Sequence, residues 1–250
     1  MSTQKSWSEK LADNKGLPKT GRIEGRMTKR WGTGTMVIPA PAEVDAVMRK
    51  VPTGKLIIFL KSPRPGQVKT RLAAEIGPQA ACVAYRKLVE LLLDQLRELP
   101  FVELRHSPDN AASEIAPWLA AGWNCRPQGS GDLGQRLIAA FDDAFAQGAE
   151  RVAVIGSDCP YLTAEDIRAA WSALSRCDVV LGPAGDGGYW LIGLRRVQPE
   201  LFHDIPWSTD QVLRATITRI QADGLSVHLL RTLEDVDTEA DWRRFLARRL

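Results

Sequence analysis

The chain has 250 residues, of which 44% are hydrophobic and 25% are charged, a globular composition with enough length for one core plus an appendage. A net charge of +3 is too small to indicate a nucleic-acid partner by itself. Four scattered cysteines without a CxxC pair argue against a zinc site or a disulfide framework. No apolar run reaches the ~18 residues of a membrane span, and the polar N-terminus lacks the apolar region of a signal peptide. We therefore expect a cytoplasmic protein without a membrane span.

The N-terminal residues differ from the rest of the chain. Residues 1–55 carry 11 Lys and Arg against 5 Asp and Glu, whereas the remaining residues carry 22 against 25. A short strand at 35–38 and a short helix at 42–50 are the candidate elements. This segment has too little apolar surface to offset its ordering entropy. We predict a basic, loosely ordered extension over residues 1–54 and a folded domain over residues 55–250.

The first strong element is an apolar strand at 56–60, which leads into a loop and then a helical pattern. The loop contains Pro65 and Gly66, and three cations flank it: Lys61, Lys69 and Arg71. A strand, a short Gly/Pro loop and a helix N-terminus form a typical phosphate-binding arrangement. The spacing does not match a Walker loop. An ordinary strand–helix turn with solvated basic residues explains the pattern equally well, so both interpretations stay open.

After residue 60 the apolar pattern alternates between helix and strand. We predict helices at 72–99, at 111–120 with Asp109 as N-cap, at 133–147, at 164–174 with Thr163 and Asp166 as a capping box, at 209–223 and at 238–249. Strands are predicted at 101–105, 152–155, 179–181, 189–194 (antiparallel) and 226–230. The alternation implies an α/β fold, a mostly parallel twisted sheet with helices on both faces. Ligands of such sheets bind at the carboxyl ends of the strands.

Acidic and glycine-rich loops follow several of these strands. Asp158, directly after a buried strand, is suited to Mg²⁺ or Mn²⁺, because these ions prefer oxygen ligands; since Thr163 fills the helix cap, a metal role is favoured over a capping role. Asp235 and Asp237 follow the last strand and are either metal ligands or helix caps. Asp186 is the charged residue of the glycine-rich run 182–190, which either approaches a ligand or forms a tight hairpin. Ser208 is favoured as a helix cap.

Six motifs occur together and in order: KSPRPGQVKTRL (61–72), GDLGQRL (131–137), IGSDCP (155–160), GPAGDGGY (182–189), WST (207–209) and DVD (235–237). With them the chain resembles the bacterial GT-A-like glycosyltransferase family formerly of unknown function, which has members assigned to arsenosugar biosynthesis. The resemblance covers residues 55–250 and implies the nucleotide-diphospho-sugar transferase fold. The family is similar in fold to nucleotidyltransferases such as phospholactate guanylyltransferase.

The resemblance also implies roles for particular residues. A nucleotide would be bound by Lys61, Pro65, Gly66, Lys69, Thr70, Arg71, Gly131, Asp132, Arg136 and Ser157. The acceptor or sugar would be bound by Gly187, Gly188, Tyr189, Trp207, Ser208 and Thr209. The metal would be held by Asp158 with Asp237 or Asp235, since Gly156 replaces the first aspartate of the usual DxD motif. Asp186 would be the catalytic base.

The sequence is therefore compatible with three candidate functions. The first is a Mg²⁺- or Mn²⁺-dependent glycosyltransferase that uses a nucleotide sugar and a small-molecule acceptor. The second is a nucleotidyltransferase that uses a nucleoside triphosphate and releases pyrophosphate. The third belongs to another class: residues 7–55 resemble the start of small DNA alkyltransferase-like proteins, although the chain lacks their reactive Pro-Cys-His-Arg motif. We interpret that segment as a truncated fusion partner.

Overall fold

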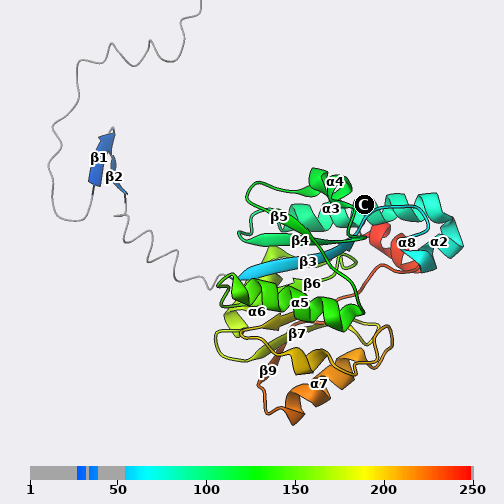
Figure 1. Cartoon of the computed structure of the whole chain (residues 1–250). Helices are drawn as coiled ribbons and strands as arrows, with labels where there is room; N and C mark the ends of the chain where they lie inside the picture. The colour runs from blue at the N-terminus through cyan, green and yellow to red at the C-terminus, as the bar shows by residue number, and fades with distance from the viewer. Residues whose placement is uncertain (1–26, 32–33, 39–53, 249–250) are drawn as a thin grey trace, which may run out of the picture. The chain divides into compact units, whose positions relative to one another are not determined.

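The computed structural model describes residues 27–31, 34–38 and 54–248, and the chain divides into two units, residues 1–50 and 51–250. In the first unit, β1 (Met27–Trp31) pairs antiparallel with β2 (Gly34–Ile38) (Figure 1). The short strand expected at 35–38 is thus confirmed. The helix expected at 42–50 and the alkyltransferase-like features lie outside the described residues. The boundary between residues 54 and 55 stays a prediction.

The second unit contains a twisted seven-stranded sheet. Its strands are β3 (Lys55–Lys61), β4 (Val102–Ser107), β5 (Asn124–Pro127), β6 (Val152–Ile155), β7 (Val179–Pro183), β8 (Tyr189–Leu194) and β9 (Val227–Leu229). The order across the sheet is β5-β4-β3-β6-β8-β7-β9. Only β8 runs antiparallel to its neighbours β6 and β7 within this sheet. The predicted mostly parallel sheet is confirmed.

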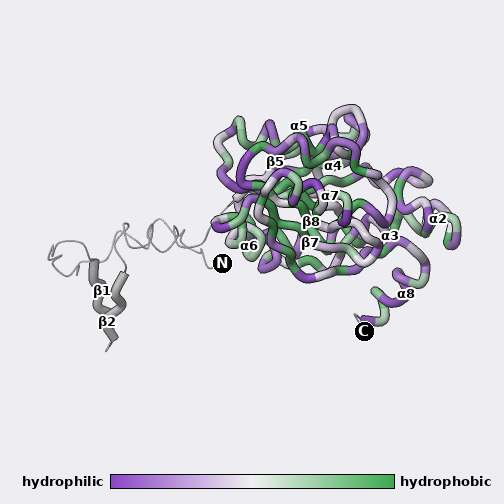
Figure 2. The backbone as a smooth tube through the Cα atoms, turned by 90° about the horizontal axis from the view of Figure 1, so that it is seen from below, coloured by the Kyte–Doolittle hydropathy of each residue, from purple (hydrophilic) through white to green (hydrophobic). Residues whose placement is uncertain are grey.

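Helices cover both faces of the sheet. They are α2 (Thr70–Ile76), α3 (Pro78–Gln95), α4 (Ala112–Ile115), α5 (Leu133–Ala146), α6 (Ala164–Ala173), α7 (Val212–Ala222) and α8 (Glu239–Ala247), with 3-10 turns η2 (Ala116–Trp118) and η3 (Pro199–Phe202). Alternate residues of β3 enter different cores: Ile58 packs with α3 and α6, whereas Ile57 packs with α5 and α7. A strand buried on both faces needs a continuous apolar run, which β3 has. Figure 2 shows hydrophobic residues concentrated along the central strands.

Three sequence predictions need correction. The helix expected at 72–99 is two helices, because Gly77 has a φ of +88° and Pro78 begins a new helix. The helix expected at 111–120 shortens to α4 and η2, and its N-cap is Ala111 rather than Asp109. The strand β5 was not predicted, since it is a short, largely exposed edge strand without an apolar pattern. Elsewhere, Thr163 and Asp166 form the expected capping box of α6.

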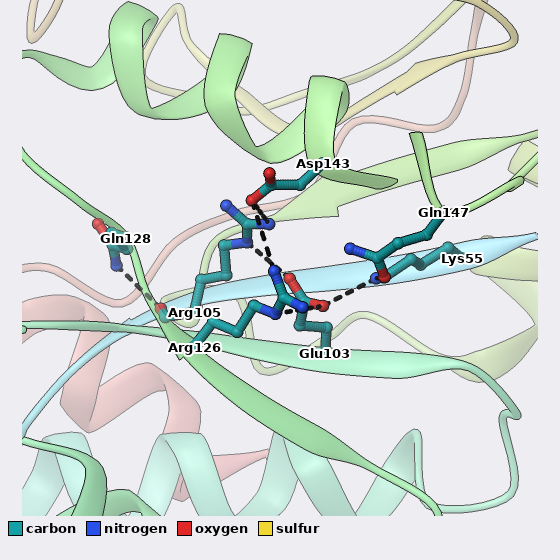
Figure 3. Close-up of polar contacts among 7 residues, drawn as sticks. All are labelled: Lys55, Glu103, Arg105, Arg126, Gln128, Asp143 and Gln147. Carbon is teal, nitrogen blue, oxygen red and sulfur yellow. Dashed lines mark hydrogen bonds and ion pairs between the residues drawn. The ribbon is translucent and has the colours of Figure 1, made fainter. Parts of the chain in front are cut away.

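A buried ionic network attaches α5 to the sheet (Figure 3). The fully buried Glu103 of β4 accepts hydrogen bonds from Lys55 Nζ at 2.8 Å and Arg105 Nε at 2.7 Å, and Arg105 also reaches Asp143 of α5 at 2.7 Å. Burial acts to raise the pKa of Glu103, but these cations outweigh it and hold the pKa below its ordinary value. The network fixes α5 over β3 and β4.

The order of the strands reverses between β3 and β6. From β3 the chain proceeds to β4 and β5 on one side, and it then returns to β6 on the other side of β3. Loops leaving the carboxyl ends of such neighbouring strands diverge, and ligands of open α/β sheets bind there. The fold therefore brings the loop after β3 and the loop after β6 to the same place. None of the helices in the described part of the chain is long and apolar enough for a membrane crossing.

Candidate active site

The centre of the candidate site is the ammonium group of Lys69. Its Nζ lies 3.0 Å from Asp158 Oδ1 and 2.8 Å from Asp237 Oδ1, and its side chain is only 3% exposed. Burial acts to lower the pKa of Lys69, but the two carboxylates outweigh it and raise the pKa above its ordinary value. Arg71, which is exposed, lies 3.7 Å from the other oxygen of Asp237. The structure thus joins the basic loop (residues 61–71) to both aspartates.

Asp237 is placed there by the acidic segment, residues 230–237. Arg231 donates two hydrogen bonds of 2.7 Å to Asp166 of α6, and the backbone N–H of Val236 donates to the carbonyl of Asp158 at 3.2 Å. Further backbone hydrogen bonds join Leu230 to Leu181, Leu233 to Pro183, and Gly185 to Leu233. Thr238, rather than Asp235 or Asp237, caps α8. This leaves both aspartate side chains at the carboxyl ends of β6 and β7, with no capping role.

The site carries an excess of negative charge. Asp235 is partly buried, and burial together with Asp158 raises its pKa to about 7, with smaller contributions from Asp186 and Asp237. The cation Lys69 opposes this rise without cancelling it. Asp186 is exposed, and its Oδ1 accepts a hydrogen bond from the N–H of Gly188 at 2.9 Å. Two carboxylates therefore contact the buried cation, and Asp235 lies within electrostatic range of Lys69 and of the other three aspartates.

These side chains fit a divalent cation that arrives with a phosphate. Among the described residues, no group of three His, Cys, Asp or Glu side chains is placed to hold a metal ion by itself. Asp158 and Asp237 converge on one point, however, and their oxygen atoms are ligands that Mg²⁺ and Mn²⁺ accept. Mg²⁺ is commonly bound through one or two carboxylates, with substrate phosphates and waters completing its shell. The pair suits that type of site rather than an all-protein cage.

The basic loop is held in place by α3. The hydroxyl of Tyr85 accepts a hydrogen bond from the backbone N–H of Lys61 at 2.8 Å, and it lies 3.1 Å from both the Lys61 carbonyl and Ser157 Oγ. Tyr85 is almost fully buried. Ser157, expected at the nucleotide, therefore links the loop after β6 to the loop after β3. The side chain of Lys61 is exposed at this edge.

A second anchor was missed by the sequence analysis. Glu114 of α4 accepts hydrogen bonds from both Arg64 and Ser62 of the basic loop, and Cys82 contacts the carbonyl of Pro63 at 3.0 Å. Nothing in the local sequence pairs Glu114 with Arg64, since they lie 50 residues apart. The other expected phosphate contacts of this loop, Pro65, Gly66 and Thr70, remain exposed. The loop is thus fixed at its beginning by α3 and α4, is exposed at Pro65 and Gly66, and becomes buried again at Val68 and the Lys69 side chain.

The GDLGQRL motif lies at the start of α5. Asp132 forms a capping box with Gln135, while Gly131 accepts a hydrogen bond from Arg136 Nε at 2.9 Å. Arg136 also donates to Gln128, at 3.3 Å. The amide of Gln128 in turn donates to the carbonyl of Leu60, at the end of β3, at 3.0 Å. The motif is therefore connected through Gln128 to the end of β3, and Asp132 acts locally as a helix cap.

The residues expected at the acceptor separate into two groups. Gly187 and Gly188 lie beside Asp186 in the turn between β7 and β8, which is the hairpin that the glycine pattern allowed. Tyr189 and Trp207 instead pack against the core that includes α5, and burial raises the pKa of the Tyr189 phenol above its usual range.

Ser208 and Thr209, the remaining residues expected at the acceptor, lie just before α7. Ser208 has a φ of 64° and does not cap α7, so its expected capping role is wrong. Thr209 Oγ1 accepts a hydrogen bond from the N–H of Gln211 at 3.2 Å. The local turn thus accounts for Thr209, and its exposed neighbour Ser208 faces solvent.

Comparison with known proteins supports the class that this fold and site define. A crystal structure from Desulfovibrio desulfuricans G20, described as a candidate nucleotide-diphospho-sugar transferase, matches with a TM-score of 0.68 and 33% identity, covering 73% of this chain and 81% of that one. A CMP:2-keto-3-deoxy-manno-octonic acid synthetase solved with CTP matches with a TM-score of 0.50 and 11% identity, over 79% of this chain and all of that one. The second likeness concerns the fold alone.

A curated relative, the phosphoenolpyruvate guanylyltransferase of Chloroflexus aggregans (strain MD-66 / DSM 9485), is 30% identical over 121 residues. The match covers 46% of this chain and 59% of the length of that relative. The protein is thus classed with transferases of the nucleotide-diphospho-sugar transferase fold. Residues 93–209 match the family described as "uncharacterized protein conserved in bacteria (DUF2064)".

Proposed function

We propose that the protein is a metal-dependent glycosyltransferase that uses a nucleotide sugar as donor and a small molecule as acceptor. The supporting observation is the convergence of Lys69, Asp158 and Asp237 beyond the carboxyl ends of β3 and β6. Exposed Lys61 and Arg71 lie in the same basic loop. Cations beside paired carboxylates at this edge suit a diphosphate ester and its metal ion.

The residues have distinct tasks in this proposal. Lys61, Lys69 and Arg71 bind the diphosphate of the donor and stabilise the negative charge that develops on it as it departs, the kind of interaction that supplies most of the catalysis in charged transfers. Asp158 and Asp237 would hold a Mg²⁺ or Mn²⁺ ion, which would supply Lewis-acid stabilisation of the same charge. Asp186, exposed at the rim, accepts the proton of the acceptor hydroxyl as it attacks.

Nucleotidyl transfer is the second candidate, and one observation favours it: the 30% identity with a guanylyltransferase. The same cations and carboxylates would bind a nucleoside triphosphate, and pyrophosphate would leave instead of a nucleoside diphosphate. The nature of the leaving group distinguishes the two candidates.

A binding experiment tests what both candidates share. Nucleotide sugars and nucleoside triphosphates are screened by thermal shift in the presence of Mn²⁺. A ligand at a hundredfold excess over its dissociation constant should stabilise the protein by about 2.7 kcal/mol. Asp158→Asn should abolish the effect, whereas Asp142→Asn, which removes an exposed carboxylate of α5, should not.

The products then separate the candidates. Phosphorus NMR should detect free nucleoside diphosphate for glycosyl transfer and pyrophosphate for nucleotidyl transfer. The proposal fails if no nucleotide stabilises the protein with Mn²⁺, or if Asp158→Asn responds as the unmodified protein does.

A further inference from the structure

The position of Lys69 has a consequence for how the site would be loaded. Its Nζ lies within 3.0 Å of one oxygen of Asp158 and one oxygen of Asp237, the two side chains assigned to the metal. Its backbone has a φ of 47°, a left-handed conformation uncommon for a residue with a side chain. Such conformations persist where the surrounding structure enforces them, and they cluster at functional sites. The fold therefore holds a cation between the two carboxylates.

A metal ion and this ammonium group cannot occupy the same position. Mg²⁺ binds oxygen ligands at ~2.1 Å, so an ion bridging Asp158 and Asp237 would lie against Lys69 Nζ. Two positive charges at such a separation repel each other strongly in a partly buried site. Either Lys69 moves away or the metal ion does not bind. Arg71, which is exposed and farther from Asp237, is not in the way.

We propose that Lys69 is the resident counter-ion of Asp158 and Asp237 and competes with the divalent cation for them. This inference rests on the proposed function. The nucleotide phosphates release Lys69, because they offer its ammonium a new anionic partner at the same edge of the sheet. The metal ion consequently binds weakly by itself and tightly together with a nucleotide. Lys69 thus couples the two binding events and keeps the site closed to free metal ions.

The test compares two ligands whose affinities should change in opposite directions. Binding of Mn²⁺ alone is measured by electron paramagnetic resonance, and binding of GTP at saturating Mn²⁺ by calorimetry. Lys69→Met should bind Mn²⁺ alone more tightly by about tenfold or more, since a competing unit charge is gone. It should bind GTP more weakly, by a similar factor. Lys61→Met removes an exposed charge from the same loop and should leave the affinity for Mn²⁺ alone within about twofold.

Other outcomes overturn the inference in recognisable ways. If Lys69→Met binds GTP more weakly but Mn²⁺ as before, Lys69 is a phosphate ligand without competition. If it binds Mn²⁺ more weakly, Lys69 supports the site instead of competing for it. If neither protein binds Mn²⁺, with or without GTP, the proposed function itself is wrong.

A measurement on the unmodified protein covers the case in which Lys69→Met does not fold. Acetylation of Lys69 by an N-hydroxysuccinimide ester is followed by mass spectrometry, with Lys87, an exposed lysine of α3, as internal reference. The side chain of Lys69 is 3% exposed, so labelling should start slowly, rise at Mn²⁺ concentrations that saturate the site, and fall again when GTP is added. An unchanged labelling rate while Mn²⁺ binds would overturn the proposal.

Discussion

Two glycines with similar backbone angles differ in their surroundings. Gly187, next to Asp186, has a φ of +88°, and a Cβ atom there would lie 2.3 Å from the carbonyl oxygen of Asp210. Gly66, in the basic loop, has a φ of +79°, with nothing within 4 Å of an added Cβ. The first position is constrained by its conformation and by a close backbone approach, and the second by its conformation alone.

Substitution by alanine should separate these two effects. Gly66→Ala should lower the free energy of unfolding by about 1–2 kcal/mol, the cost of a left-handed conformation for a residue with a side chain. Gly187→Ala should cost clearly more, because backbone must also move away from the new methyl group. Urea unfolding of both variants measures the difference. Equal losses of unfolding free energy in the two variants would mean that the backbone of the turn between β7 and β8 shifts to accommodate the new methyl group at little energetic cost.

At the scale of elements, α3 sets the spacing between two loops of the candidate site. Tyr85 contacts the backbone of Lys61 and the side chain of Ser157, so one phenol joins the loops that follow β3 and β6. The contact requires the hydroxyl and not only the ring. Losing it would leave the core packed but the two loops free to separate.

We expect Tyr85→Phe to lower nucleotide affinity in the presence of Mn²⁺ by about tenfold, with a loss of stability of only about 1 kcal/mol. Trp123→Phe is a matched control, because it removes another buried aromatic hydrogen bond, from Trp123 Nε1 to the Leu99 carbonyl at 3.3 Å. Calorimetry and thermal unfolding of both variants provide the comparison. Similar losses of affinity in the two variants would assign the effect to general destabilisation.

The sequence predicted those elements whose signals are local. The apolar run of β3 and the capping box at Thr163 depend on neighbouring residues, and the structure contains them. The break at Gly77 was missed because the apolar period of α3 continues across it. The edge strand β5 was missed because its pairing with β4 gives no local pattern.

The site was predictable in a different way. Residues 61–71 and Asp158 could be placed at one edge of the sheet from their positions after strands, since the carboxyl ends of parallel strands meet there. The resemblance paired Asp158 with Asp237 or Asp235 as metal ligands, but the contact between Lys69 and Asp237 was not predicted, because no local pattern connects the two. The pairing of Arg64 with Glu114 could not be inferred at all, since it depends on how α4 packs after the fold has formed.

At the scale of the whole molecule, the network around Glu103 ties β3, β4 and α5 together, so its charge state affects global stability. The folded-state pKa of Glu103 lies below its ordinary value of 4.5. Its contribution is therefore fully present above about pH 4.5 and is lost as the pH falls through the lower folded-state pKa. The protein should lose stability over that acidic window.

Glu103→Gln should destabilise the protein at neutral pH by about 3–5 kcal/mol, because Lys55 and Arg105 then lack their buried counter-charge. The variant should also lose less stability on acidification than the unmodified protein. Denaturant unfolding from about pH 7 down to about pH 3, which spans the expected loss of stability, checks both points. Glu75→Gln, at an exposed position of α2, serves as the control and should change neither. If Glu103→Gln lowers the free energy of unfolding at neutral pH by less than about 1 kcal/mol, the network adds little stability.

Lys69 and Asp237 touch although they lie 168 residues apart along the chain. A nascent polypeptide can build β3 and the basic loop early in synthesis, but the second carboxylate emerges from the ribosome only near the end. Contacts between such distant partners form late in folding, because closing the long intervening loop costs entropy. The contact between Lys69 and Asp237 therefore forms only in molecules that have been translated past residue 237, and premature termination leaves the buried ammonium of Lys69 without this partner.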